Sequence, residues 1–311
     1  MPDVTLPALV DAPASDHHIV LGAPGSGKTE LLQQRFLALV AQGISADNLL
    51  IATPTRHQAS HLRDVLGLRL GQATQGARVR SLAALAFSLV ESFHRHEGLP
   101  APDLMKASQI DLDIQALLSG HEDDGSGPDW PEMFGPDVRA TRVFRQELRE
   151  WIARVGENGA TSDQILEMAA RHGRPEWAAA AQFRDEYRRV VASARPGAFD
   201  SGEIFARAVA ALTQGVPKEW EGLSHLLVED AHDLTHAGLT LIEALASQGI
   251  GMTVVSEPDV AGNTFRGSEP AGHARLAVSW HVAPTVLNQV WRHGSNIRAV
   301  GSEVTARIGT A

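Results

Sequence analysis

The sequence predicts an α/β fold, in which a parallel sheet carries helices on both faces and an all-helical subdomain is inserted. Two observations support this prediction. Short apolar stretches that end in polar loops alternate with helical periodicity up to residue 92 and again over residues 198–284. Between them, residues 93–197 show helical patterns with hardly any β-branched runs. We therefore expect a core formed by residues 1–92 and 198–284, interrupted by a helical insertion.

The first predicted strand contains Ile19 and Val20 and runs into the glycine-rich segment GAPGSGKT, after which a helix begins near Glu30. A strand, a loop and a helix in this order turn backbone N–H groups toward one point, where a polyphosphate can bind. The sequence therefore predicts a site for ATP and Mg²⁺, in which Lys28 reaches the β- and γ-phosphates and the Thr29 hydroxyl binds Mg²⁺. The predicted loop consists of Gly22, Ala23, Pro24, Gly25, Ser26, Gly27, Lys28 and Thr29.

The second predicted strand, residues 49–52, ends in the segment TPTRHQASHLRDVL, a loop that turns into a helix, and the apolar helix SLAALAFSLV follows. Basic residues gather in this region, and a stripe of this kind is what a nucleic-acid backbone requires. They are Arg56, His57, Arg63, Arg78 and Arg80. A solvated helix face explains Arg63 equally well.

The segment HLLVEDAHDL, residues 225–234, predicts a further strand that ends in acidic residues. ATPases with a phosphate-binding loop need an acid at such a strand end to hold Mg²⁺, and a neighbouring carboxylate to take a proton from the attacking water. Glu229 and Asp230 supply this pair. An ordinary strand end with acidic loop residues has the same pattern, but the upstream phosphate loop favours the catalytic interpretation. The segments GMTVVSEPD and LAVSWHVAPTVLNQVWR continue the sheet pattern.

The composition limits the classes of function. With 311 residues, of which 43% are hydrophobic, the chain can form one large domain or two unequal ones. The absence of cysteine excludes disulfides, thiolate metal sites and cysteine nucleophiles. Because no segment has the apolar length of a membrane span and no signal peptide is evident, we expect no membrane partner and a cytoplasmic location. The net charge of −10 means that any DNA contact must come from a local groove.

Side chains outside these motifs predict no further chemistry. The 14 histidines include the pairs His17/His18 and His94/His96, and we interpret them as ordinary surface residues rather than metal ligands. The helical insertion contains tryptophans whose expected role is core packing rather than base stacking. These are Trp130, Trp151 and Trp177.

The order of the segments resembles the successive motifs of superfamily 1 DNA helicases of the UvrD/Rep/RecB type. The similar segments are GAPGSGKT, TPTRHQASHLRDVL, SLAALAF, LLVEDAHDLT, SEPDVAGNTFRGS and LNQVWRHGSNI. The resemblance covers the chain except for the helical insertion, and it implies that the core is a RecA-like P-loop domain. Within and after the insertion, ELREWIARVGENGATSDQILEMAARHGRPEW and GAFDSGEIF look like the motor subunits of actinobacterial helicase–nuclease complexes of the AdnA/AdnB type.

The resemblance also implies roles for single residues. Lys28 and Thr29 match the phosphate and Mg²⁺ residues of the family, and Glu229 and Asp230 match the acids of its second motif, with Glu229 as the Mg²⁺ acid. Arg292 matches an arginine that approaches the γ-phosphate from a second motor domain. Residues expected at the DNA follow from the same motifs and from the basic cluster. They are Thr53, Thr55, Arg56, Arg80 and Arg266, of which Arg266 lies in the family-specific element formed by Phe265, Arg266 and Gly267.

Several positions depart from the family pattern. The second motif of the family reads Asp then Glu, whereas this chain has Glu229 then Asp230, so the expected base is one methylene shorter and turnover should suffer more than binding. Glutamines of the second and third motifs are replaced by His232 and Val260. The family's side chains that stack on bases or contact the DNA strand are also replaced, which should lower the affinity for single-stranded DNA. The positions concerned are Pro54, Ala83 and Asn263.

Two functions remain open. Residues 285–311 are expected to begin a second motor domain that is missing, so no unwinding is expected from this chain alone. The first function is the ATP-binding motor domain of a DNA helicase in double-strand-break repair, with weak hydrolysis, acting on single- or double-stranded DNA beside a partner motor or nuclease subunit. The alternative is a catalytically inactive pseudo-motor that serves as a DNA- or partner-binding scaffold of a helicase–nuclease complex.

Overall fold

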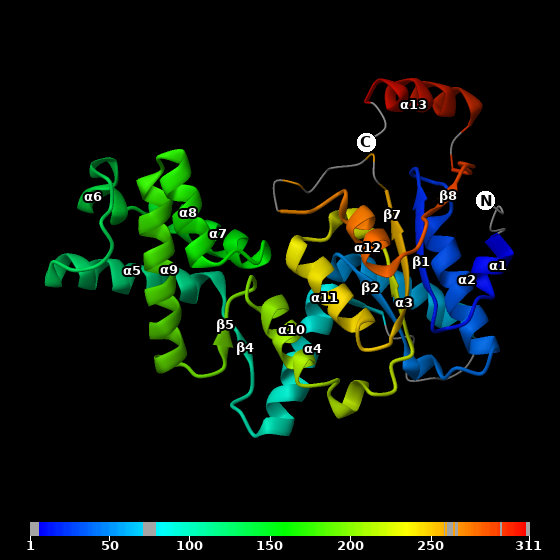
Figure 1. Cartoon of the computed structure of the whole chain (residues 1–311), viewed down its shortest axis with the longest axis horizontal. Helices are drawn as coiled ribbons and strands as arrows, with labels where there is room; N and C mark the ends of the chain where they lie inside the picture. Colours follow the sequence, from blue (N-terminus) through cyan, green and yellow to red (C-terminus); the bar gives the residue numbers. More distant parts are fainter. Residues whose placement is uncertain are drawn as a thin grey trace.

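Figure 1 shows the computed structural model of the chain, which describes residues 6–70, 79–257, 259, 264, 267–292 and 294–308. A six-stranded sheet lies at the centre of the α/β part, and all neighbouring strands in it run parallel. The strand order is β3-β2-β6-β7-β1-β8. In this order the strands cover Val79–Ser81, Leu49–Thr53, His225–Val228, Gly251–Ser256, His17–Gly22 and Thr285–Leu287. The predicted α/β fold with a parallel sheet is therefore confirmed.

Helices cover both faces of the sheet, because successive residues of each buried strand point to opposite sides. Leu226 and Val228 of β6 pack into the core on one face, whereas Leu227 between them packs into the core on the other. The first core is closed by α4 (Leu82–Glu97), α10 (Ile204–Thr213), α11 (His236–Ala246) and α12 (Gly272–Trp280). The second is closed by α1 (Leu6–Val10), α2 (Lys28–Ala41) and α3 (Arg56–Leu70).

A group of helices lies beside the sheet and has a core of its own, with Ile114 and Phe183 fully buried in it (Figure 1). Its helices are α5 (Ala107–Asp124), α6 (Pro136–Arg139), α7 (Arg142–Glu157), α8 (Ser162–His172) and α9 (Pro175–Ala194). A short parallel ladder of β4 (Asp103–Leu104) and β5 (Ala198–Phe199) joins the two chain segments at its edge. The tryptophans predicted to pack in this part do so, since Trp130, Trp151 and Trp177 all contact its buried residues.

Connections between these elements contain the 3-10 helices η1 (Ala46–Asn48), η2 (Glu132–Phe134), η3 (Lys218–Trp220) and η4 (Ala231–Asp233). After β8 the chain continues into α13 (Ser295–Ile308), which lies apart from the sheet (Figure 1). In the described part of the chain, none of the helices is both long and apolar enough to cross a membrane.

Two sequence expectations need correction. The stretch LAVSWHVAPTVLNQVWR is predicted to continue the sheet, but its first residues belong to α12 and only Thr285–Leu287 forms a strand. A short apolar run has the same appearance in a buried helix as in a buried strand, which explains the error. The interpretation of the histidines as surface residues is wrong for His121, His225 and His232, which are buried, and His225 in β6 is completely so.

Candidate functional site

The glycine-rich loop connects the end of β1 at Gly22 with α2, which begins at Lys28. Gly25 and Gly27 have φ values of 79° and 96°, a left-handed conformation that disfavours any residue with a side chain. A Cβ atom on Gly25 would also lie only 2.6 Å from the Cβ of Arg292. The loop therefore needs these glycines, and the first turn of α2 has N–H groups without partners within the helix, as the predicted anion site requires.

Lys28 makes three polar contacts inside the protein. Its Nζ donates hydrogen bonds to the carbonyl oxygens of Gly22 (2.5 Å) and Ala23 (3.1 Å) and forms an ion pair with Glu257 Oε2 (3.1 Å). The Lys28 and Glu257 side chains are 8% and 9% exposed, so this ion pair is buried. Glu257, which directly follows β7, has no local signal in the sequence that distinguishes it from other acids at strand ends.

The two predicted Mg²⁺ ligands lie in contact. Thr29 Oγ1 donates a hydrogen bond of 2.5 Å to Oε1 of Glu229, the residue that follows β6. The other carboxylate oxygen of Glu229 is buried and has no hydrogen-bond partner among the described residues, and the same holds for Ser26 Oγ in the loop. A hydroxyl and a carboxylate with an unused oxygen are the oxygen ligands that Mg²⁺ prefers, so the residues present fit the predicted metal.

Burial and the neighbouring Asp230 carboxylate raise the pKa of Glu229 to about 7. The pKa of Asp230 is also raised, chiefly by burial. Burial is the largest cause of both pKa shifts, because it disfavours the charged form of each carboxyl group. Carboxylates buried in this way would bind a divalent cation in competition with protons, so the affinity of the predicted Mg²⁺ site would depend on pH.

Asp230 is fixed by its backbone and by one side chain. Its φ of 47° is in the left-handed region, and its Oδ2 accepts a hydrogen bond of 2.9 Å from Gln58 Nε2 of α3. The Gln58 Oε1 atom also accepts a hydrogen bond of 2.7 Å from the Thr55 hydroxyl at the start of this helix. Gln58 thus connects the loop after β2 to the acids after β6. The sequence carries no signal for this contact, since the two residues are 172 positions apart.

Arg292 lies beside the glycine-rich loop. The Trp291 N–H donates a hydrogen bond of 2.9 Å to the Gly25 carbonyl, which holds this part of the chain against the loop. Trp291 and Arg292 are both exposed. The structure therefore brings the loop, the acids after β6 and Arg292 together at the carboxyl ends of the central strands.

The residues predicted to contact DNA have different environments. Thr53 is buried at the end of β2, where its hydroxyl donates to the Thr55 carbonyl (2.8 Å), while Thr55 and Arg56 are exposed. The Arg80 guanidinium lies over the ring of Trp220, 5.6 Å from its centroid. In the predicted basic cluster, Arg63 donates to the Val79 carbonyl. The residues of these predictions that lie outside the described part of the chain are Arg78, Val260, Asn263, Phe265 and Arg266.

A crevice of about 570 Å³ separates α7 from the loop after β2 and the start of α4. Pro54 and Ala83, two of the departures from the family pattern, line it. The α7 side chains in its wall include the acids Glu150 and Glu157 beside Arg154. A single strand needs aromatic platforms and basic side chains, and in this lining Phe205 and Arg154 are of these kinds, beside the acids Glu150, Glu157 and Asp233.

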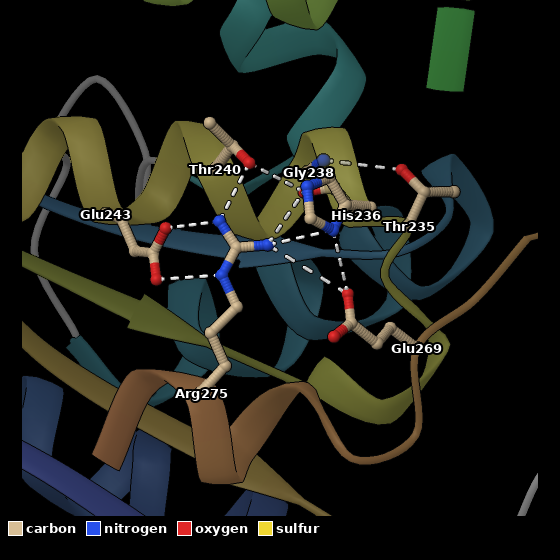
Figure 2. A network of polar contacts seen from close by, with 7 residues as sticks. All are labelled: Thr235, His236, Gly238, Thr240, Glu243, Glu269 and Arg275. Atoms are coloured by element: carbon tan, nitrogen blue, oxygen red, sulfur yellow. Dashed lines mark hydrogen bonds and ion pairs between the residues drawn. The ribbon is translucent and has the colours of Figure 1, made fainter. Parts of the chain in front are cut away.

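Arg275 connects α12 to α11, as Figure 2 shows. Its Nε donates to Glu243 Oε1 at 3.0 Å and its Nη2 donates to the other oxygen of the same carboxylate. The same Nη2 lies 2.9 Å from Thr240 Oγ1, and Nη1 lies 3.0 Å from His236 Nδ1. A guanidinium with this many acceptors fixes the crossing of the two helices.

The same network reaches the segment after Gly267. His236 Nδ1 lies 3.2 Å from Glu269 Oε2 (Figure 2), and the Glu269 N–H donates a hydrogen bond of 2.8 Å to the Leu234 carbonyl. Thr235 pairs with Ser268 in an antiparallel bridge. The chain after the acids of β6 and the chain before α12 are thus held together at several points.

Taken together, the parallel sheet, the glycine-rich loop and the contact of Thr29 with Glu229 define a P-loop nucleotide-binding domain. Residues 8–277 match the family model described as the UvrD/REP helicase N-terminal domain. The chain therefore belongs to this family of superfamily 1 helicase domains.

Two curated relatives are helicases. The chain is similar to the ATP-dependent DNA helicase srs2 of Schizosaccharomyces pombe, with 24% identity over 257 residues, which are 80% of this chain and 28% of that protein. It is also similar to DNA helicase II of Haemophilus influenzae, with 24% identity over 307 residues, which are 96% of this chain and 39% of that protein. The chain thus spans well under half the length of either relative.

Proposed function

We propose that this chain is the ATP-binding first motor domain of a superfamily 1 DNA helicase. The observation that carries the proposal is the 2.5 Å hydrogen bond between Thr29 and Glu229, because it joins the glycine-rich loop to the acidic strand end in the way that Mg²⁺ coordination requires. Membership of the UvrD/REP family supports the same function.

Each site residue has a role in this proposal. Lys28 binds the β- and γ-phosphates, Thr29 and Glu229 hold Mg²⁺, and the backbone N–H groups from Gly22 to Thr29 surround the phosphates. Bound Mg²⁺ supplies positive charge to the phosphate oxygens. Asp230 takes the proton of the attacking water, and Arg292, which lies next to Gly25, approaches the γ-phosphate.

Hydrolysis is proposed to be weak. A general base must come within about 2.6–3.2 Å of its proton, directly or through one water. Asp230 has a shorter side chain than the glutamate of the family pattern. One of the Asp230 carboxylate oxygens also accepts a hydrogen bond from Gln58. The pKa of Asp230 is raised by burial, which reduces the fraction of the ionised base.

The proposed nucleic-acid partner is single- or double-stranded DNA. Thr55 and Arg56 support this proposal because they are exposed at the start of α3. Thr53 would act through its hydrogen bond to Thr55, and Arg80 would have to leave Trp220 to reach a phosphate. Arg266 is the fifth residue that we propose to contact DNA. The AdnA/AdnB-like segments suggest double-strand-break repair in the cytoplasm, beside a partner motor or nuclease subunit.

We also propose a division of the chain. Residues 1–92 and 198–284 form the ATPase core, and residues 93–197 form the inserted helical subdomain. The separate core around Ile114 and Phe183 supports this division. Residues 285–311 begin a second motor domain.

The alternative function is a catalytically inactive scaffold that binds DNA or a partner subunit. The reversed order of Glu229 and Asp230 and the bond from Gln58 favour it. The test is Mg²⁺-dependent ATP turnover with and without single-stranded DNA, compared with Lys28→Ala. DNA-stimulated turnover that Lys28→Ala abolishes supports the motor. Nucleotide binding without turnover supports the scaffold, and failure to bind any nucleotide overturns the proposed site.

A further inference from the structure

Glu257 lies at the same edge of the sheet as the glycine-rich loop and Glu229. It follows β7, which pairs with β1 on one side and with β6 on the other. The carboxyl ends of parallel neighbours meet at one edge, so the Glu257 side chain can reach the loop that follows β1. Its Oε2 atom lies 3.1 Å from Lys28 Nζ.

The contacts of Lys28 use its whole hydrogen-bonding capacity. An ammonium group has three N–H donors, and Lys28 has acceptors at Gly22, Ala23 and Glu257. A phosphate oxygen can bind Lys28 only by replacing one of them. Among these three partners, the two carbonyls belong to the backbone of the loop, whereas the Glu257 carboxylate is an anion on a side chain that can rotate.

We propose that Glu257 takes the place of a phosphate at Lys28 in the nucleotide-free protein and must be displaced when a nucleoside triphosphate binds. Carboxylate and phosphate are both anions, so they compete for the same ammonium group. The second oxygen of Glu257 is buried with no hydrogen-bond partner in the described part of the chain. When a phosphate replaces Glu257 at Lys28, the Glu257 carboxylate loses its ion-pair partner. It is then an uncompensated buried charge next to the phosphates, which is unfavourable. Glu257 therefore lowers nucleotide affinity.

The backbone of Glu257 is bonded to the turn that follows the acids after β6. The Glu257 N–H donates a hydrogen bond of 3.2 Å to Nδ1 of His232, which is 6% exposed. His232 lies in η4, which Asp230 precedes directly. The same residue that releases Lys28 is therefore bonded to the turn that carries the proposed base. This inference rests on the proposed function and describes the regulation of the same site.

The test compares nucleotide affinities of the full chain and its variants, measured by titration with a fluorescent ATP analogue in Mg²⁺ buffer. Glu257→Gln keeps the size of the side chain and an oxygen for Lys28 but removes the competing charge. We expect it to raise the affinity on the order of tenfold, the effect of a difference of about 1.4 kcal/mol. Glu257→Asp keeps the charge, so its affinity should remain within about threefold of the wild-type value. The melting temperature of the nucleotide-free Glu257→Gln protein should fall, because Lys28 loses its ion pair.

The matched control is Glu30→Gln, which removes a negative charge from the first turn of α2, where Glu30 forms an exposed ion pair with Arg69. An equal affinity gain in this control, or no gain in Glu257→Gln, overturns the proposal. If the wild-type protein binds nucleotide and Glu257→Gln binds it no more tightly, only the displacement of Glu257 is refuted and the proposed nucleotide site stands. If neither protein binds nucleotide, the proposed function fails as well.

Discussion

Thr29 and Glu229 share a hydrogen bond of 2.5 Å although they are 200 residues apart in the sequence. One residue lies in the first turn of α2 and the other follows β6, so the contact exists only because both strand ends meet at one edge of the sheet. It is the place where the proposed Mg²⁺ site can be tested most directly.

Thr29→Ala should remove the Mg²⁺-dependent part of nucleotide affinity. The variant keeps Lys28 and the loop backbone, but it lacks the hydroxyl that would coordinate the cation. We expect a loss on the order of tenfold in Mg²⁺ buffer and little change in the presence of EDTA. Thr29→Ser retains the hydroxyl and should behave like the wild type. An equal loss in both buffers would show that Thr29 acts on the loop rather than on the metal.

Exchanging the two acids should raise turnover. In the double variant Glu229→Asp, Asp230→Glu, the residue order matches the family pattern and the proposed base gains one methylene. Because a well-placed general base contributes about 10²–10⁴ in rate, we expect ATP hydrolysis to rise at least about tenfold. The measurement is steady-state phosphate release with single-stranded DNA present. Unchanged hydrolysis in a double variant that still binds nucleotide would contradict the proposed cause of weak turnover.

The sequence predicts those parts of the site whose signal is local. The glycine-rich loop is readable because a strand, glycines with left-handed φ and a helix start follow one another within a few residues. Glu229 and Asp230 are readable because acids end a buried strand. Gln58 and Glu257 are not, since their partners lie 172 and 229 positions away and are chosen by the strand order.

In the fold, too, only features with a local sequence signal can be predicted. The parallel sheet is predicted from apolar stretches, but no local pattern indicates that β7 lies between β6 and β1. The basic residues predicted to form one cluster with Arg80 contact different parts of the protein. Arg80 lies over Trp220, a residue that follows it by 140 positions (220 minus 80), and Arg63 donates to a backbone carbonyl.

Gly251→Ala should destabilise the fold. A Cβ at this position would lie 1.7 Å from the Ala14 carbonyl oxygen and 2.6 Å from His225 Nδ1, so β7 or the chain before β1 has to move. We expect a loss of about 3 kcal/mol in the free energy of unfolding, measured with urea. Gly67→Ala in α3 meets no atom within 4 Å and is the matched control. It should stabilise the protein by about 0.5–1 kcal/mol, because alanine favours the helix.

His225 should make the protein less stable in acid. Burial lowers its pKa from 6.5 to about 3. Its neutral ring donates from Nδ1 to the Ala14 carbonyl and accepts at Nε2 from the Thr253 hydroxyl. The unfolded chain takes up this proton near pH 6.5, whereas the folded protein does so only near pH 3. The stability contributed by neutral His225 is therefore complete above pH 6.5 and is lost as the pH falls toward 3.

At pH 5 this loss amounts to about 2 kcal/mol relative to pH 7.5. Urea unfolding at both pH values measures it. His225→Asn keeps a donor for Ala14 but does not titrate, so its free energy of unfolding should change less between the two pH values. The same pH dependence in both proteins would show that another group is responsible.

The Arg275–Glu243 pair should be worth more than an exposed ion pair of the same kind. Its side chains are 26% and 21% exposed and share two hydrogen bonds, so the charges are poorly screened by water. A double-mutant cycle with Arg275→Ala and Glu243→Ala should give a coupling free energy of about 1–2 kcal/mol. Arg171 and Glu167, which are 63% and 70% exposed on α8, form the control pair. There we expect at most about 0.5 kcal/mol. Equal coupling in the two cycles would mean that the network between α11 and α12 adds nothing to an ordinary surface contact.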